Sequence, residues 1–131
     1  MITSVHTLIY SDDATATRAF LKDVLRWPYV SESEGTDDPA DWLIFGTGPS
    51  ELGVHPTFAL HEGREYTSRR HHEIALMCDD IDATVAELTA RGASFDGEPR
   101  DMGFGVGVRM EVPGADEMLL YAPKHGVAYG L

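Results

Sequence analysis

Residues 73–80 read EIALMCDD, and residues 81–92 continue IDATVAELTARG. The first stretch predicts a short strand, because apolar side chains fill it and its two closing aspartates are typical helix N-cap residues. The second stretch predicts a helix, since Ile81, Val85 and Leu88 recur at helical spacing and the final glycine suits the left-handed position after a helix. A strand that runs directly into a capped helix therefore opens this half of the chain.

Short strands are predicted after this helix. The first begins at Ser94–Phe95, the second covers Val106–Val112 and the third covers Met118–Tyr121. The turn sequence PGAD at 113–116 lies between the last two. The order of elements in this half is thus strand, helix and three strands.

The first half of the chain has the same predicted order. A strand over Val5–Tyr10 leads into the capping sequence SDD and a helix that continues to about Leu25, before a proline three residues further on. Strands are then predicted near residues 29–30, 42–45 and 52–55. The turn-rich, charged stretch 58–70 is predicted to be a linker.

A shift of 67 residues superposes the two halves without a gap. It places Asp12 and Asp13 on Asp79 and Asp80, and it carries the register as far as a proline at position 56 matching another at 123. A register kept over this length indicates an internal duplication. We therefore predict a single domain over 1–131 made of two β-α-β-β-β modules, at about 1–62 and about 68–131.

Composition excludes several classes of partner. The 131 residues include 22 acidic and 10 basic ones, for a formal charge of −12, and such a surface repels the phosphates of nucleic acids. No apolar run approaches the roughly 20 residues that span a membrane, and the N-terminus has no secretory signal pattern. Cys78 is the only cysteine, so no intrachain disulfide forms. We expect a cytoplasmic protein with a neutral or cationic small-molecule partner.

The chain resembles the vicinal oxygen chelate superfamily, which includes glyoxalase I, bleomycin-resistance proteins, extradiol dioxygenases and fosfomycin-resistance enzymes. The resemblance rests on HTLIYSDD at 6–13, FLKDVL at 20–25, EIALMCDD at 73–80 and MLLYAP at 118–123. It implies an α+β fold in which two tandem modules form a curved mixed sheet around a cup, and it implies a homodimer. Arg26 departs from the pattern, because the family usually has a glycine at the end of this helix.

The resemblance places a ligand on the concave face of the sheet, and alternation along each strand then sorts the residues. His6, Leu8 and Tyr10 should face the cup, and so should Glu73, Ala75 and Met77. The alternate residues of the second strand should pack under the helix, which makes Cys78 a buried, unreactive thiol. The candidate ligand-binding residues are His6, Tyr10, Glu51, His55, Glu73, Met77, Phe104, Glu117 and Tyr121, with Trp42 as a further aromatic contact.

Members of the family that do chemistry hold a divalent metal at four strand positions, so a zinc, nickel, manganese or iron ion is the possible cofactor. The corresponding positions here are His6, Leu52, Glu73 and Leu119, and the two leucines cannot bind a metal. A slip of one residue in the strand around 51–55 would turn Glu51 and His55 inward instead, because it exchanges the two faces. His6, Glu51, Glu73 and Glu117 would then form a carboxylate-rich cluster. The register without the slip supplies only His6 and Glu73 as possible metal ligands, and it therefore favours a site without metal.

Two functions remain open at this point. The first is a small-molecule-binding protein of the glyoxalase/bleomycin-resistance type, which holds its ligand in an acidic, aromatic-lined cup. The second is a metal-dependent lyase or isomerase of the glyoxalase kind, or an extradiol-type dioxygenase, with His6 as one metal ligand. The glycine-rich segment 103–107 is either a loop that covers the ligand with Phe104 or an ordinary flexible loop, and His125 is expected at the surface.

Overall fold

The structure is a computed structural model, and it describes residues 6–31, 35–51, 53–54 and 56–128. It confirms an α+β fold with few helices and several short strands. The elements are the helix α1 (Ala14–Ala19), the short π-helix η1 (Phe20–Val24), β1 (Tyr29–Ser31), β2 (Leu43–Phe45), β3 (Phe58–His61), β4 (Arg64–Thr67), β5 (Ala75–Met77), α2 (Ile81–Ala90), β6 (Arg100–Asp101), β7 (Gly105–Met110) and β8 (Met118–Pro123).

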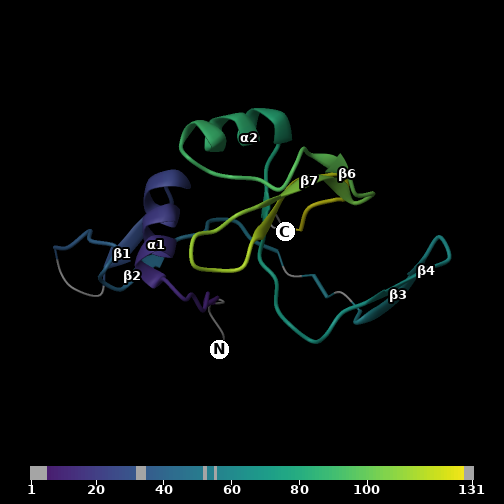
Figure 1. The fold of residues 1–131 in the computed structure, drawn as a ribbon, viewed down its shortest axis with the longest axis horizontal. Helices are drawn as coiled ribbons and strands as arrows, with labels where there is room; N and C mark the ends of the chain where they lie inside the picture. The colour runs from purple at the N-terminus through teal and green to yellow at the C-terminus, as the bar shows by residue number, and fades with distance from the viewer. Residues whose placement is uncertain (1–5, 32–34, 52, 55, 129–131) are drawn as a thin grey trace.

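The largest sheet belongs to the second half of the chain. Its strand order is β5-β8-β7-β6, with β5 parallel to β8 and the other neighbours antiparallel, so the sheet is mixed. In Figure 1, α2 lies over this sheet. Ile74, Leu76 and Cys78 pack against the hydrophobic core, which confirms the predicted sorting of residues 73–78 into two faces.

The core joins the second half to the helical segment of the first. Met110 is fully buried, and Phe20 and Leu21 of η1 belong to the same buried cluster as Ile81 and Leu88 of α2. Hydrogen bonds fix this contact, because Asp12 N donates to Gly114 O at 2.8 Å and Thr17 Oγ1 donates to Pro113 O at 2.5 Å. The turn between β7 and β8 is therefore anchored to the start of α1.

The two helix starts have the same local structure, as the 67-residue shift predicts. Asp13 accepts from Ala16 N at 3.0 Å, and Asp80 accepts from Ala83 N at the same distance. Four residues after each cap a threonine lies against the carbonyl of the capping aspartate: Thr84 Oγ1 donates to Asp80 O at 2.6 Å, and Thr17 Oγ1 lies 3.2 Å from Asp13 O. The second aspartate of each pair quoted from the sequence is thus the N-cap of its helix.

Two of the four strands predicted in the first half are wrong, while those near residues 29–30 and 42–45 are confirmed as β1 and β2. Residues 6–10 have no regular structure, and Gly53 and Val54 lie outside any strand, while Leu52 and His55 lie outside the described residues. A strand forms only where a neighbour completes its hydrogen bonds, and in the described part β1 and β2 pair only with each other. In the second half, the strand predicted to begin at Ser94–Phe95 is reduced to an isolated bridge between Phe95 and Met110. The short strand β6 was not predicted.

The predicted linker contains a β-hairpin instead. β3 and β4 pair antiparallel from Phe58↔Thr67 to His61↔Arg64. The two residues between them, Glu62 and Gly63, have φ values of +50° and +75°, as a tight two-residue hairpin turn requires. The Glu-Gly pair at the two turn positions was the sequence signal for this turn.

Arg26 adopts a left-handed conformation with φ of +56°, at the position where a glycine was expected. A residue with a Cβ pays about 1–2 kcal/mol in this region. Arg26→Gly is therefore expected to raise the free energy of unfolding by about 1 kcal/mol, after the extra freedom of glycine in the unfolded chain is subtracted. Urea denaturation measures the change. Arg26→Ala keeps the Cβ, and an equal gain in that variant would contradict this explanation.

The helices of the described residues include none that is long and apolar enough to cross a membrane.

Candidate functional site

Met77 and Tyr121, the predicted ligand-binding residues that lie on described strands, share the sheet face opposite α2. Residues directly opposite each other in neighbouring strands share a face, and the register pairs Met77 with Tyr121 and Tyr121 with Gly107. A Cβ on Gly107 would lie 2.8 Å from Tyr121 Cβ, and a Cβ on Gly105 would lie 2.7 Å from Tyr121 Cδ2. The two glycines of β7 therefore make room for the Tyr121 side chain.

An aromatic cluster surrounds Tyr121, which is itself buried. The ring of Phe104 meets the ring of Tyr121 edge-on, with centroids 5.4 Å apart and an interplanar angle of 81°. The ring centroids of His125 and Tyr121 lie 5.9 Å apart, and His125 Nε2 is 3.0 Å from Tyr121 Oη. The Glu51 carboxylate lies 3.9 Å from the same Nε2. We call Glu51, Phe104, Tyr121 and His125 the Tyr121 cluster.

Hydrogen bonding sets the tautomer of His125. Its Nδ1 lies 2.7 Å from the carbonyl oxygen of Gly126, which can only accept, so Nδ1 carries a hydrogen. In the neutral ring Nε2 is then an acceptor, and the Tyr121 hydroxyl donates to it. Burial, and then the negative charge of Glu51, raise the pKa of Tyr121, so the phenol keeps its proton.

Glu51 comes to this cluster from outside the strands. Its Oε2 accepts a hydrogen bond from Ala128 N at 2.7 Å, so it ties the segment after β2 to the end of the described chain. Only about a fifth of its side chain is exposed. A half-buried carboxylate beside aromatic rings is a local source of negative potential.

A second group of charges lies at the other end of the same face. Arg109 of β7 donates to Glu73, and its Nε lies 3.7 Å from Glu117 Oε1. His71 Nε2 is 3.7 Å from the other oxygen of Glu73. The two predicted carboxylates therefore share an arginine that was not predicted. Its signal was alternation, since Arg109 follows Gly105 and Gly107 at every second position of one strand.

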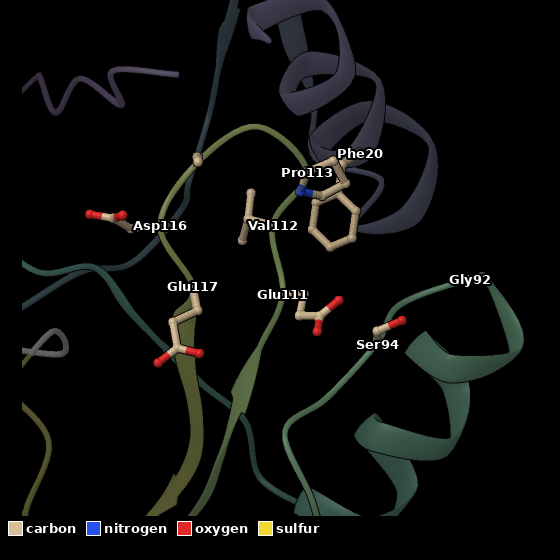
Figure 2. A pocket seen from close by; sticks show the side chains of 9 residues that line it. Phe20, Gly92, Ser94, Glu111, Val112, Pro113, Asp116 and Glu117 are labelled. Atoms are coloured by element: carbon tan, nitrogen blue, oxygen red, sulfur yellow. The ribbon is translucent and has the colours of Figure 1, made fainter. Parts of the chain in front are cut away.

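Two hollows are open in the described surface. One of about 490 Å³ is lined by Met77, Cys78, Asp79, Ala122 and Pro123, and it adjoins Tyr121 along β8. The other, of about 450 Å³, lies between η1 and the turn that joins β7 to β8. Figure 2 shows its lining residues, among them Phe20 on the helical segment and Glu111 and Glu117 at the ends of the two strands. Both volumes suit a small organic molecule.

Cys78 lines the first hollow without being an activated nucleophile. Desolvation by burial is the main cause that raises the pKa of its thiol, and the charges of Asp79 and Asp80 act in the same direction. A thiol that keeps its proton reacts slowly. The side chain is half-buried rather than fully buried.

The family model described as Glyoxalase/Bleomycin resistance protein/Dioxygenase superfamily matches residues 3–120. The chain belongs to this superfamily. The resemblance seen in the sequence is thereby confirmed. No curated protein matches the sequence.

Solved structures of superfamily members share the fold at low sequence identity. A member from Sphaerobacter thermophilus DSM 20745 is 20% identical with a TM-score of 0.56, over 92% of this chain and 98% of that one. TnmS3, an antibiotic binding protein from Streptomyces sp. CB03234, is 19% identical with a TM-score of 0.56, over 95% and 99%. A lactoylglutathione lyase from Agrobacterium tumefaciens is 16% identical with a TM-score of 0.53, over 92% of each chain.

The remaining predicted residues are not gathered with Tyr121 by any described contact. His6 is exposed, and Tyr10 is 90% exposed, in a segment without regular structure. Trp42 is half exposed, and the guanidinium of Arg18 lies 5.2 Å from its ring centroid. His55 lies outside the described residues. His125 is exposed, as expected, and it also contacts Tyr121, which was not predicted.

The described donors do not fit the divalent metal that the superfamily implies. Within residues 6–31, 35–51, 53–54 and 56–128, no three His, Cys, Asp or Glu side chains converge. Leu119 lies on the site face, opposite Ala75, where a ligand would be needed, and Glu73 is engaged by Arg109. The carboxylate cluster predicted from the slipped register does not form, because Glu51 belongs to the Tyr121 cluster while Glu117 is paired with Arg109.

Proposed function

We propose that this chain is a small-molecule-binding protein, and that it holds a neutral or cationic organic ligand beside the Tyr121 cluster. The observation that carries the proposal is the buried Tyr121 ring, with Phe104 on it and the Glu51 carboxylate near it, next to a hollow of about 490 Å³. The name of TnmS3 as an antibiotic binding protein supports this kind of function in the same fold.

The chemistry of the site suits a ligand that is flat and apolar in one part. Met77 offers a polarizable thioether, and the rings of Phe104 and Tyr121 offer aromatic surface. Glu51 adds attraction for a positive group, and the net charge of −12 favours a cation further at long range. Glu73 and Glu117 contribute less, because Arg109 offsets their charge.

The proposal extends to the setting of the protein. We place the chain in the cytoplasm as a homodimer that binds neither nucleic acid nor membrane. We also retain the prediction of one domain with modules at about 1–62 and about 68–131. The similar caps of α1 and α2 support the duplication.

A series of three aromatic probes tests the ligand class. Calorimetric titration should give the tightest binding for benzyltrimethylammonium, weaker binding for benzyl alcohol and none for benzenesulfonate. Glu51→Gln should weaken binding of the cation by about fivefold, as the loss of one nearby charge in a partly exposed site predicts. It should leave binding of the alcohol unchanged.

The matched control is Asp82→Asn, which removes the same charge from an exposed position of α2. It should leave all three affinities unchanged in buffer of physiological ionic strength, because screening suppresses distant charges. If both variants weakened binding of the cation equally, the attraction would come from the acidic surface in general and not from Glu51. Preference for benzenesulfonate would overturn the proposed ligand class.

A further inference from the structure

We infer that His125 makes the proposed ligand site sensitive to pH, so that the site binds a cation at neutral pH and releases it in mild acid. The inference rests on the proposed function and concerns the regulation of the same site. His125 Nε2 lies 3.9 Å from Glu51 Oε1, so a proton on His125 places a positive charge beside the carboxylate that attracts the ligand. Histidine is the side chain whose charge ordinarily changes between pH 5 and 8.

Backbone hydrogen bonds on both sides hold the segment that carries His125 in place. The amide of the preceding residue, Lys124, donates to Phe104 O at 2.8 Å. Three residues after His125, Ala128 N donates to Glu51 Oε2 at 2.7 Å. The side chain of His125 is 35% exposed, so protons from the solvent reach the ring. The imidazole is therefore fixed beside Glu51 and still open to titration.

Protonation changes the hydrogen bonding of His125 as well as its charge. In the neutral ring Nδ1 donates to Gly126 O, and Nε2 accepts from the Tyr121 hydroxyl at 3.0 Å. Both nitrogens of an imidazolium carry a hydrogen, so Nε2 becomes a donor. The Tyr121 oxygen and the Glu51 carboxylate are the acceptors on that side. The contact of Nδ1 is the same in both states, so the ring does not need to turn over.

The other titratable groups close to His125 keep their charge state in this pH range. Tyr121 keeps its proton, because burial and the charge of Glu51 raise the pKa of its phenol. Lys124 Nζ lies 2.6 Å from Asp101 Oδ2, and this hydrogen bond lowers the pKa of the Asp101 carboxyl. Carboxylates ordinarily stay charged above about pH 5. Among these groups, His125 is the one expected to change its charge between pH 8 and pH 5.5.

The carboxylate at the other end of the face has a partner whose charge is permanent. Arg109 donates to Glu73, and an arginine keeps its positive charge at every relevant pH. His71 also lies 3.7 Å from Glu73, but the arginine already offsets that carboxylate. Within the part of the chain that the structure describes, Glu51 pairs with no lysine or arginine. Its charge is therefore offset only when His125 carries a proton.

Calorimetric titration of the full chain with benzyltrimethylammonium at pH 8 and at pH 5.5, at equal ionic strength, tests the inference. The charge of this probe does not depend on pH, so a change in affinity comes from the protein. The affinity should be about fivefold lower at pH 5.5, the same factor as for loss of the Glu51 charge. Benzyl alcohol should bind equally at both pH values, which would show that the site stays folded.

His125→Gln keeps a hydrogen-bonding side chain that never becomes positive, so the ratio of the two affinities should fall to about one. His71→Gln is the matched control, because it removes a histidine beside a carboxylate at the other end of the face. Its ratio should stay at about fivefold. The imidazole proton resonances of the parent chain give a second readout. Saturation with the probe should move protonation of His125 to lower pH, because the coupling between proton and cation is reciprocal.

Equal affinities of the cation at pH 8 and pH 5.5 in the parent chain would overturn the inference and leave the proposed ligand site in place. A ratio that persists in His125→Gln would also overturn it, because another group would then carry the pH dependence. Absence of binding at both pH values would instead overturn the proposed function, and this inference with it.

Discussion

Met110→Ala is expected to lower the free energy of unfolding by about 2–5 kcal/mol. Met110 has no exposed surface, and it lies at the end of β7 opposite Met118. Its side chain belongs to the buried cluster in which η1, α2 and the four-stranded sheet meet. Removing it leaves a cavity where three parts of the fold come together, and the neighbours can collapse into that cavity only in part.

Urea denaturation followed by circular dichroism gives the magnitude. Met102→Ala is the matched control, because Met102 lies between β6 and β7 and is half exposed, so its loss should cost much less. A change of less than about 1 kcal/mol for Met110→Ala would contradict the assignment of Met110 to the centre of the core.

Gly107→Ala is expected to lower the free energy of unfolding by about 1–3 kcal/mol, the usual range for a methyl group forced into a filled space. A Cβ at this position would lie 2.8 Å from Tyr121 Cβ and 2.9 Å from Leu120 O. Both atoms belong to the adjacent strand, close to its backbone, so neither can move aside cheaply. The variant should also displace Tyr121 from its contacts with Phe104 and His125.

Gly53→Ala is the control, since nothing lies within 4 Å of a Cβ built there. Thermal unfolding should show a lower midpoint for Gly107→Ala and an unchanged midpoint for Gly53→Ala. Near-ultraviolet circular dichroism reports the aromatic rings of the Tyr121 cluster. An unchanged spectrum and midpoint in Gly107→Ala would contradict the close packing of β7 on Tyr121.

The features that the sequence predicted correctly are local ones. The aspartate caps, the apolar face of α2 and the turn at 113–116 all depend on residues within a few positions of one another. The inward and outward faces of residues 73–78 were also correct, because alternation in a strand needs no knowledge of its partner.

The errors concern contacts between distant segments. Residues 6–10 have the composition of a strand, yet no described neighbour pairs with them. His125 follows β8 and is exposed as expected, but its contact with Tyr121 was not predicted, because that contact depends on the path of the chain after Pro123. Arg109 was missed because alternation along β7 gives only its face of the sheet, whereas its role depends on Glu73 and Glu117, which come from other segments.

The central claim is that the ligand binds beside Tyr121. Backbone amide shifts in nitrogen-15 correlation spectra, recorded while benzyltrimethylammonium is added, test it most directly. The largest shifts are predicted at Met77, which lines the hollow of about 490 Å³, and at Phe104, Tyr121 and His125. Shifts confined to Phe20, Glu111 and Asp116, around the hollow of about 450 Å³, would contradict it.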